Sequence, residues 1–169
     1  GNTWAELLGG NEGPWLGSTG VDFNGFGNFK LDVPLTGVNN YTVIVNPSWN
    51  ATTNFTRQAY AVTVASSGNI TVTNKTSVTA VTTQVASGKT VYPLTLGIPS
   101  VTGIVVDPDS NTVANSWVVP FNAATNEGYW QQGVNSRNNG EIAMNLASGN
   151  YKLEANVPWG STGAAKSAK

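Results

Sequence analysis

The stretch YTVIVNPSW at residues 41–49 decides how this chain is organised, because YKLEANVPW at residues 151–159 repeats its plan. Both copies place Asn five residues after Tyr and Trp three residues after Asn. The offset between matched landmarks stays between 110 and 115 residues, so we interpret the chain as a tandem array of about one and a half units. The earlier landmarks are NTW at 2–4 and NSW at 115–117, NEGPW at 11–15 and NEGYW at 126–130, and GNFKLDV at 27–33 and GEIAMNL at 140–146.

The composition is typical of a folded, weakly charged protein. The 169 residues include no Cys and no His, 10% are charged, and the formal net charge is −1. Eight Lys and Arg residues, balanced by nine Asp and Glu, are too few for the basic surface that nucleic acid or an anionic membrane attracts. We therefore expect no nucleic-acid partner. No run of 18 apolar residues is present, so we expect no membrane span either.

Nearly every regular segment has the two-residue period of a strand. Apolar and polar residues alternate at 29–33, 142–146 and 151–155, which puts one face of each segment into a core. Turn sequences rich in Gly, Asn and Ser separate the segments. We therefore predict an all-β chain of two β-sandwich modules, residues 1–97 and 98–169. Further Val- and Thr-rich runs lie at 60–64, 70–73, 91–96 and 101–106.

Three stretches of the second copy follow a known pattern. VTGIVVD at 101–107 has the form Val-x-Gly-x-Val-x-Asp, TVANSWV at 112–118 follows loosely, and RNNGEIAMNLASGNYKL at 137–153 keeps the glycines and the Tyr of a closing segment. With these residues the second copy resembles the carboxypeptidase regulatory-like domain of bacterial and archaeal secreted or cell-surface proteins. Its Asp, Phe and Pro positions differ from the family pattern. The resemblance implies transthyretin- or immunoglobulin-like sandwiches that act as spacer, stalk or binding module.

Each module is predicted to lack strands at the chain's outer end. The first copy has no Val-x-Gly-x-Val strand before Gly1, and the second ends before equivalents of 60–64 and 91–96. Two explanations stay open: the sequence is an excerpt from a longer array, or subunits complete one another head-to-tail by strand addition and form a fibre. The second explanation predicts donor or acceptor edges at Val101, Gly103, Val105, Tyr60, Val62, Val64, Leu94 and Leu96.

Catalysis is not expected of this chain. Without His or Cys, the commonest general base and the most reactive nucleophile are missing. The possible acid pairs, Asp22 with Asp32 and Glu127 with Glu141, are predicted to be solvated surface groups. DPDSN at 107–111 has the spacing of a calcium loop, but the position of the final Glu is Val118. We expect a turn and no cofactor there. Calcium binding by Asp107, Asp109 and Asn111 is the weaker alternative.

The tryptophans are the remaining candidates for interaction. Large rings at repeated positions are expected to fill the ends of modules whose aliphatic side chains are small. Trp15 and Trp130, in the Asn-Glu-Gly-x-Trp loops, are the alternative candidates for stacking against glycans. The predicted module-packing residues are Trp4, Trp49, Trp117 and Trp159.

We therefore expect a secreted or cell-surface protein, a repeat of a stalk, adhesin or fibre. Its partners would be copies of itself or neighbouring repeats, and glycan binding is the alternative function. N-linked glycosylation would fit such a location, although chance alone gives about as many acceptor motifs in this composition. The acceptor candidates are Asn40, Asn50, Asn54, Asn69 and Asn74.

Overall fold

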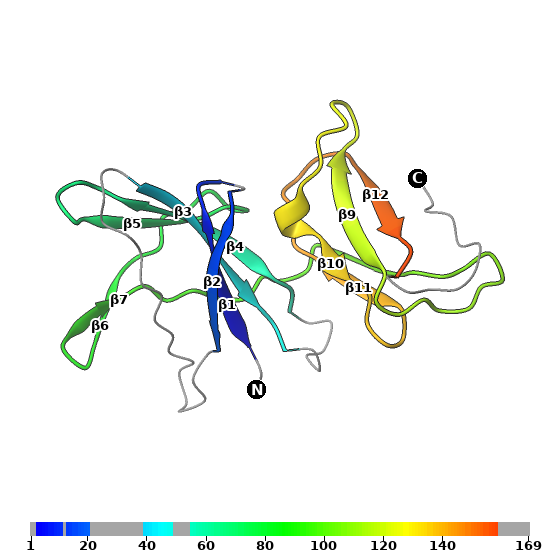
Figure 1. The fold of residues 1–169 in the computed structure, drawn as a ribbon, viewed down its shortest axis with the longest axis horizontal. Coiled ribbons are helices and arrows are strands. Elements are labelled where there is room, and N and C mark those ends of the chain that lie inside the picture. Colours follow the sequence, from blue (N-terminus) through cyan, green and yellow to red (C-terminus); the bar gives the residue numbers. More distant parts are fainter. Residues whose placement is uncertain (1–2, 12, 21–38, 49–54, 159–169) are drawn as a thin grey trace. The chain divides into compact units, whose positions relative to one another are not determined.

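The computed structural model describes residues 3–11, 13–20, 39–48 and 55–158 (Figure 1). These ranges contain several antiparallel sheets and one 3-10 turn, and no α-helix lies within them. The prediction of an all-β fold is confirmed. Contacts divide the chain into two compact units. Of the described residues, unit 1 holds those up to Ser48 and Arg57–Leu96, and unit 2 holds residues 55–56 and those from Gly97 onward.

Unit 1 is built on one five-stranded antiparallel sheet with strand order β2-β1-β3-β4-β5. In the register of β1 with β3, Trp4 lies opposite Asn46. In the register of β3 with β4, Val43 lies opposite Tyr60. The strands are β1 Trp4–Gly9, β2 Trp15–Gly20, β3 Asn39–Asn46, β4 Gln58–Val64 and β5 Ile70–Asn74.

One face of this sheet carries the hydrophobic core of unit 1. Alternate residues of the strands point to that face, because successive side chains project to opposite sides of a sheet. Tyr60 is the largest fully buried side chain, with 1% of its surface exposed. The buried cluster is Leu7, Tyr41, Val43, Val45, Tyr60, Val62, Val64 and Val72, and Val81, Tyr92, Leu94 and Leu96 pack against it.

The segment 91–96, predicted to be a strand, is mostly irregular. A short hairpin of β6 (Gln84–Ala86) and β7 (Lys89–Val91) ends at its first residue, and Pro93 has no N–H for a ladder. At Thr95 the backbone bonds to a side chain, the Tyr60 hydroxyl. It accepts the N–H of Thr95 (2.8 Å) and lies 2.7 Å from the Thr95 carbonyl, to which it donates. The strand prediction is wrong for most of this segment, because Pro93 cannot donate to a ladder and the Thr95 backbone bonds to the buried Tyr60 hydroxyl.

Unit 2 consists of two small sheets that share a core, as in a β-sandwich. One has the order β10-β9-β12 and the other pairs β11 with β8. Val118 of the first sheet packs with Ile142, Met144 and Leu146. The elements are β8 Val101–Ile104, β9 Trp117–Asn122, the 3-10 turn η1 Trp130–Gln132, β10 Val134–Asn135, β11 Glu141–Met144 and β12 Tyr151–Asn156.

Thr56 belongs to unit 2, although unit 1 resumes at the next residue, Arg57, and β4 begins at Gln58. Its backbone exchanges two hydrogen bonds with Gly97, both of 2.9 Å. Its hydroxyl donates to the carbonyl of Ala143 on β11 (2.6 Å). These bonds anchor the chain to unit 2 immediately before it enters β4, which the sequence did not indicate.

Backbone conformations with positive φ mark the tight turns. Gly68, Gly88 and Gly140 have φ of 83°, 73° and 78°, and they lie in the turn sequences SGN, SGK and NNG. Val78 is different, because a β-branched residue at φ 55° is strained by its own side chain. The Val78 side chain is 78% exposed, so it buries too little apolar surface to offset that strain.

Replacing Val78 with Gly should raise the free energy of unfolding by about 1 kcal/mol. The left-handed conformation costs an L-residue about 1–2 kcal/mol, and the added chain entropy of Gly cancels part of the gain. Urea or thermal unfolding measures the change. Val85→Gly is the matched control, because Val85 is equally exposed (79%) but lies in β6 with ordinary φ. Equal destabilisation by both substitutions would contradict the strain at Val78.

Candidate functional site

The same pair of strands occurs in both units. In β1 and β3, Trp4 lies opposite Asn46, and in β9 and β12, Trp117 lies opposite Asn156. The Trp and Asn landmarks of the sequence therefore occupy equivalent places in the two strand pairs. At the other end Gly9 pairs with Tyr41 and Asn122 with Tyr151, and the bond from the Gly10 N–H to the Asn40 carbonyl (2.7 Å) recurs between Ala123 and Asn150 (3.0 Å).

In unit 1 this strand pair carries a carboxylate that binds both the Trp and the Asn. Glu6 lies two residues after Trp4, on the same face of β1. Its Oε1 accepts hydrogen bonds from Trp4 Nε1 (2.8 Å) and from Asn46 Nδ2 (3.1 Å). Burial lowers the pKa of Arg57, and the charge of Glu6 opposes that shift. Glu6 thus links the Trp4 side chain on β1 to the buried Asn46 side chain on β3 and lies close enough to Arg57 to influence its pKa.

Unit 2 has the corresponding acid on the other strand. In unit 1 Glu6 lies opposite Ile44, whereas in unit 2 the equivalent pair is Val119 and Glu154. Glu154 is half-buried, and no described residue gives its carboxylate a hydrogen bond or an ion pair. The amide of Asn156 instead donates to the carbonyl of Trp117 (3.2 Å). Neither acid nor Arg57 was predicted from the sequence, although Glu6 lies two residues from Trp4, the spacing of one face of a strand.

Trp4 and Trp117 are both half-buried within their own units. The ring of Trp117 lies directly on Gly133, where an added Cβ would be 2.5 Å from Cζ2 of the indole. These contacts fit a packing role, and the predicted packing between modules stays a prediction. Trp49 and Trp159, assigned the same role, lie outside the described residues.

Trp15 and Trp130 expose 62% and 53% of their surfaces. Trp15 is the first residue of β2 and Trp130 the first of η1, so neither lies in an open loop. The ring of Trp130 meets Phe121 edge-on, with ring centres 5.6 Å apart and planes at 78°. Gly128 makes this pair possible, because a Cβ there would lie 2.9 Å from both rings.

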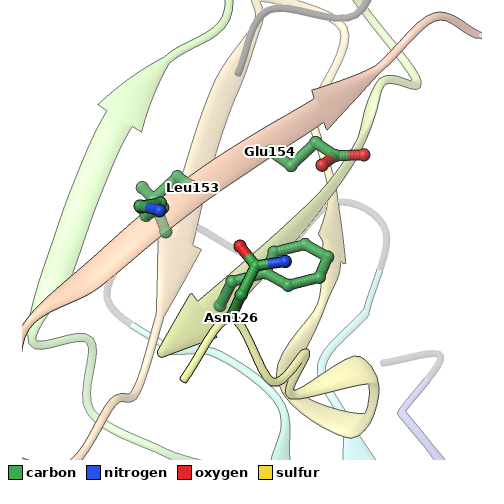
Figure 2. Close-up of a pocket in the computed structure, with 5 residues that line it drawn as sticks. Asn126, Leu153 and Glu154 are labelled. Atoms are coloured by element: carbon green, nitrogen blue, oxygen red, sulfur yellow. The ribbon is translucent and has the colours of Figure 1, made fainter. Parts of the chain in front are cut away.

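A pocket of about 420 Å³ lies beside this aromatic pair, which sequence analysis did not predict. Figure 2 shows Leu153 and Glu154 on β12 and Asn126 in the loop that follows β9. The pocket combines an aromatic floor with an amide, a cation and a carboxylate, and its volume falls in the range of small-ligand sites. It is lined by Phe121, Asn126, Lys152, Leu153 and Glu154.

The residues predicted as strand-addition edges differ in their surroundings: β4 has a strand on both sides, whereas β8 has only β11 beside it among the described strands. On β8, Val101 and Gly103 lie opposite Met144 and Ile142 of β11. β4, with Tyr60, Val62 and Val64, is held between β3 and β5. Val105 donates its N–H to the Gly140 carbonyl, and Leu94 and Leu96 pack on the core of unit 1.

The stretch 107–111 forms a closed turn around the Asp107 carboxylate. Oδ1 accepts the backbone N–H groups of Asp109 (2.9 Å) and Asn111 (2.8 Å), and Oδ2 accepts the Asn111 amide (3.1 Å). These bonds lower the pKa of Asp107, the Asn111 side chain most of all. In the described part of the chain no three Asp, Glu, His or Cys residues gather as metal ligands. Of the acids considered for catalysis, Glu127 is exposed, Glu141 is half-buried on β11, and Asp22 and Asp32 lie outside the described residues.

The glycosylation candidates differ in their surroundings. Asn69 is exposed in the turn between β4 and β5. Asn74 is half-buried, and its Oδ1 accepts bonds from Gln58 and from the backbone of Thr76 and Ser77. Asn40 is exposed and accepts the hydroxyl of Thr63 (2.9 Å). Asn50 and Asn54 lie outside the described residues.

Comparison of the chain with protein-family models, with curated proteins and with solved structures finds no match. The resemblance to the carboxypeptidase regulatory-like domain therefore stays a prediction. Within the described ranges, no helix has the length and apolar character that a membrane crossing needs.

The Asp107 turn should weaken in acid. Its carboxylate has a pKa below the ordinary value of 3.8, so its bonds are complete above that value and are lost as the pH falls through the lowered pKa. Carbon-detected NMR titration of the Asp107 carboxyl measures this pKa. In an Asn111→Ala variant the pKa should rise toward the ordinary value, whereas an unchanged pKa would contradict the assigned cause.

Proposed function

We propose that the chain is a structural and interaction repeat of an extracellular stalk, adhesin or fibre. The observation that carries the proposal is the strand pair that recurs with the same Trp–Asn register in both units. Units that repeat along one chain are typical of elongated assemblies, in which each unit contacts its neighbours. The low content of charged residues and the many Asn and Thr residues fit a protein that acts as a spacer better than they fit an enzyme.

Strand complementation between subunits or neighbouring repeats is the association that fits this architecture. Strand β3 has neighbours on both sides, β1 and β4, whereas its equivalent β12 has only β9 beside it among the described strands. A sheet edge of this kind offers backbone N–H and C=O groups to an added strand. Head-to-tail addition would produce an open fibre, because the contact is heterologous.

Negative-stain electron microscopy of the native material, together with intact mass spectrometry of the dissociated chain, tests this proposal. Fibres built from a chain close to 17.6 kDa would support complementation between subunits. A far heavier chain would instead support neighbouring repeats within one polypeptide. Discrete particles of a chain close to 17.6 kDa would contradict the assembly role.

Glycan binding is the second candidate function, and the aromatic pocket of unit 2 favours it. Sugar rings stack their C–H faces on aromatic side chains, and their hydroxyls need amide, carboxylate or ammonium partners. Phe121 supplies the ring that lines the pocket, the exposed Trp130 packs edge-on against Phe121, and Asn126, Lys152 and Glu154 supply the polar groups. Trp15 is exposed on β2, but the pocket lies in unit 2.

Replacing Asn126 with Gly should weaken glycan binding about five- to tenfold, because the loss of one hydrogen bond costs about 1 kcal/mol. Gly suits this position, since Asn126 has φ of 59°. Saturation-transfer NMR with cellohexaose, laminarihexaose and mannohexaose measures binding. Trp130→Ala should abolish it, and Trp15→Ala serves as the matched control in unit 1. Absence of binding by all three sugars, or equal losses in the two Trp variants, would contradict a site in this pocket.

A further inference from the structure

We propose that the outer edge of β12 accepts residues 57–64 from a second copy of the chain, in the register in which β3 holds β4. This inference rests on the proposed function as an associating repeat, and it names the acceptor, the donor and their alignment. Three independent features of the described residues support it: the strand equivalence, an exposed core-side Leu, and a complementary charge.

The alignment follows from the equivalence of β3 and β12. Tyr41 corresponds to Tyr151 and Asn46 to Asn156, because each holds the same place opposite β1 or β9. β3 places Thr42 opposite Ala61, Val43 opposite Tyr60 and Val45 opposite Gln58. Transferred to β12, that register sets Lys152 opposite Ala61, Leu153 opposite Tyr60 and Ala155 opposite Gln58.

The core-side surface of β12 lacks the cover that β4 gives to β3. Val43 is 7% exposed where Tyr60 lies opposite it, whereas its counterpart Leu153 is 38% exposed. A large aromatic ring opposite an aliphatic side chain is among the favourable cross-strand pairs. An incoming Tyr60 would therefore cover Leu153 and extend the apolar face that Ala155 and Tyr151 begin.

The charges of donor and acceptor are complementary. In unit 1 the cation of Arg57 interacts with the carboxylate of Glu6 across β3. In unit 2 the acid lies on β12 itself, as Glu154, and its carboxylate has no hydrogen bond or ion pair with a described residue. An added strand in this register puts Ala59 opposite Glu154 and Arg57 two residues further along the same face. Glu154 would thus lie near Arg57 of the second copy, as Glu6 lies near Arg57 within unit 1.

A second copy fits this edge better than the chain's own residues 159–169. That segment, WGSTGAAKSAK, contains no Arg, no Tyr and no alternating apolar run. Residues 57–64, RQAYAVTV, have both the cation and the period of a strand. Because β4 is already paired in its own unit, a copy donates it by strand exchange, as in domain swapping.

Disulfide trapping tests the register without requiring that exchange. The natural chain has no Cys, so a Lys152→Cys variant carries a single thiol. Synthetic peptides of residues 56–75, which include β4 and β5, each carry one Cys at position 59, 61 or 63. The peptide with Cys at 61 should cross-link at least tenfold faster than the other two. Equal rates, or no cross-link, would overturn the proposal.

The charge is tested separately with a fluorescent peptide of the natural sequence. Glu154→Gln should raise the dissociation constant about three- to fivefold, as expected for loss of one partly exposed ion pair. Glu127→Gln is the matched control, because Glu127 is an exposed acid of the same unit outside β12. Equal effects of the two substitutions would overturn the pairing of Arg57 with Glu154.

Two further outcomes separate this inference from the proposed function. Fibres that form while the peptide fails to bind would keep the assembly role and reject this edge as its contact. If a Lys152→Cys, Ala165→Cys double variant formed a disulfide within one chain faster than it cross-linked to the peptide, the edge of β12 would be assigned to residues 159–169 of the same chain. That outcome would overturn donation by a second copy.

Discussion

The pairing of a Trp with an Asn across two antiparallel strands is the constraint on which both units depend. A slip of one residue in either pair would turn every side chain of the strand to the opposite face, because side chains alternate with a period of two. Trp4 with Asn46 therefore positions Leu7 and Val43 in the core of unit 1. Trp117 with Asn156 does the same for Val118 in unit 2.

The two units share this frame but distribute charge differently over it. Glu6 closes the Trp–Asn pair of unit 1 with two hydrogen bonds, and it is opposed by an aliphatic side chain on β3. In unit 2 the acid and the aliphatic residue have exchanged strands, so Glu154 stands at the outer edge. A half-buried carboxylate gains most when a cation and hydrogen bonds accompany it. This relocation is the feature of unit 2 on which the proposed association with another strand rests.

The all-β class, most strands and the glycine turns follow from the sequence, because alternation and turn chemistry are local signals. The failures have tertiary causes. Residues 91–96 were predicted to be a strand, yet Pro93 interrupts the segment and the Thr95 backbone bonds to the Tyr60 hydroxyl, 35 residues away in the sequence. The pocket at Phe121 and the cluster around Glu6 join residues from different strands, so no local sequence pattern predicts them. Thr56 likewise belongs to unit 2 because of its hydrogen bonds to Gly97 and Ala143, which are distant in the sequence.

Cross-strand nuclear Overhauser effects in the isotopically labelled protein test the repeated register most directly. The account predicts close α-proton or amide contacts between Trp4 and Asn46 and, in the same spectrum, between Trp117 and Asn156. Contacts of Trp117 with a neighbour of Asn156 in place of Asn156 itself would mean that β12 is shifted by one residue. That result would contradict the shared strand frame and every assignment that depends on it.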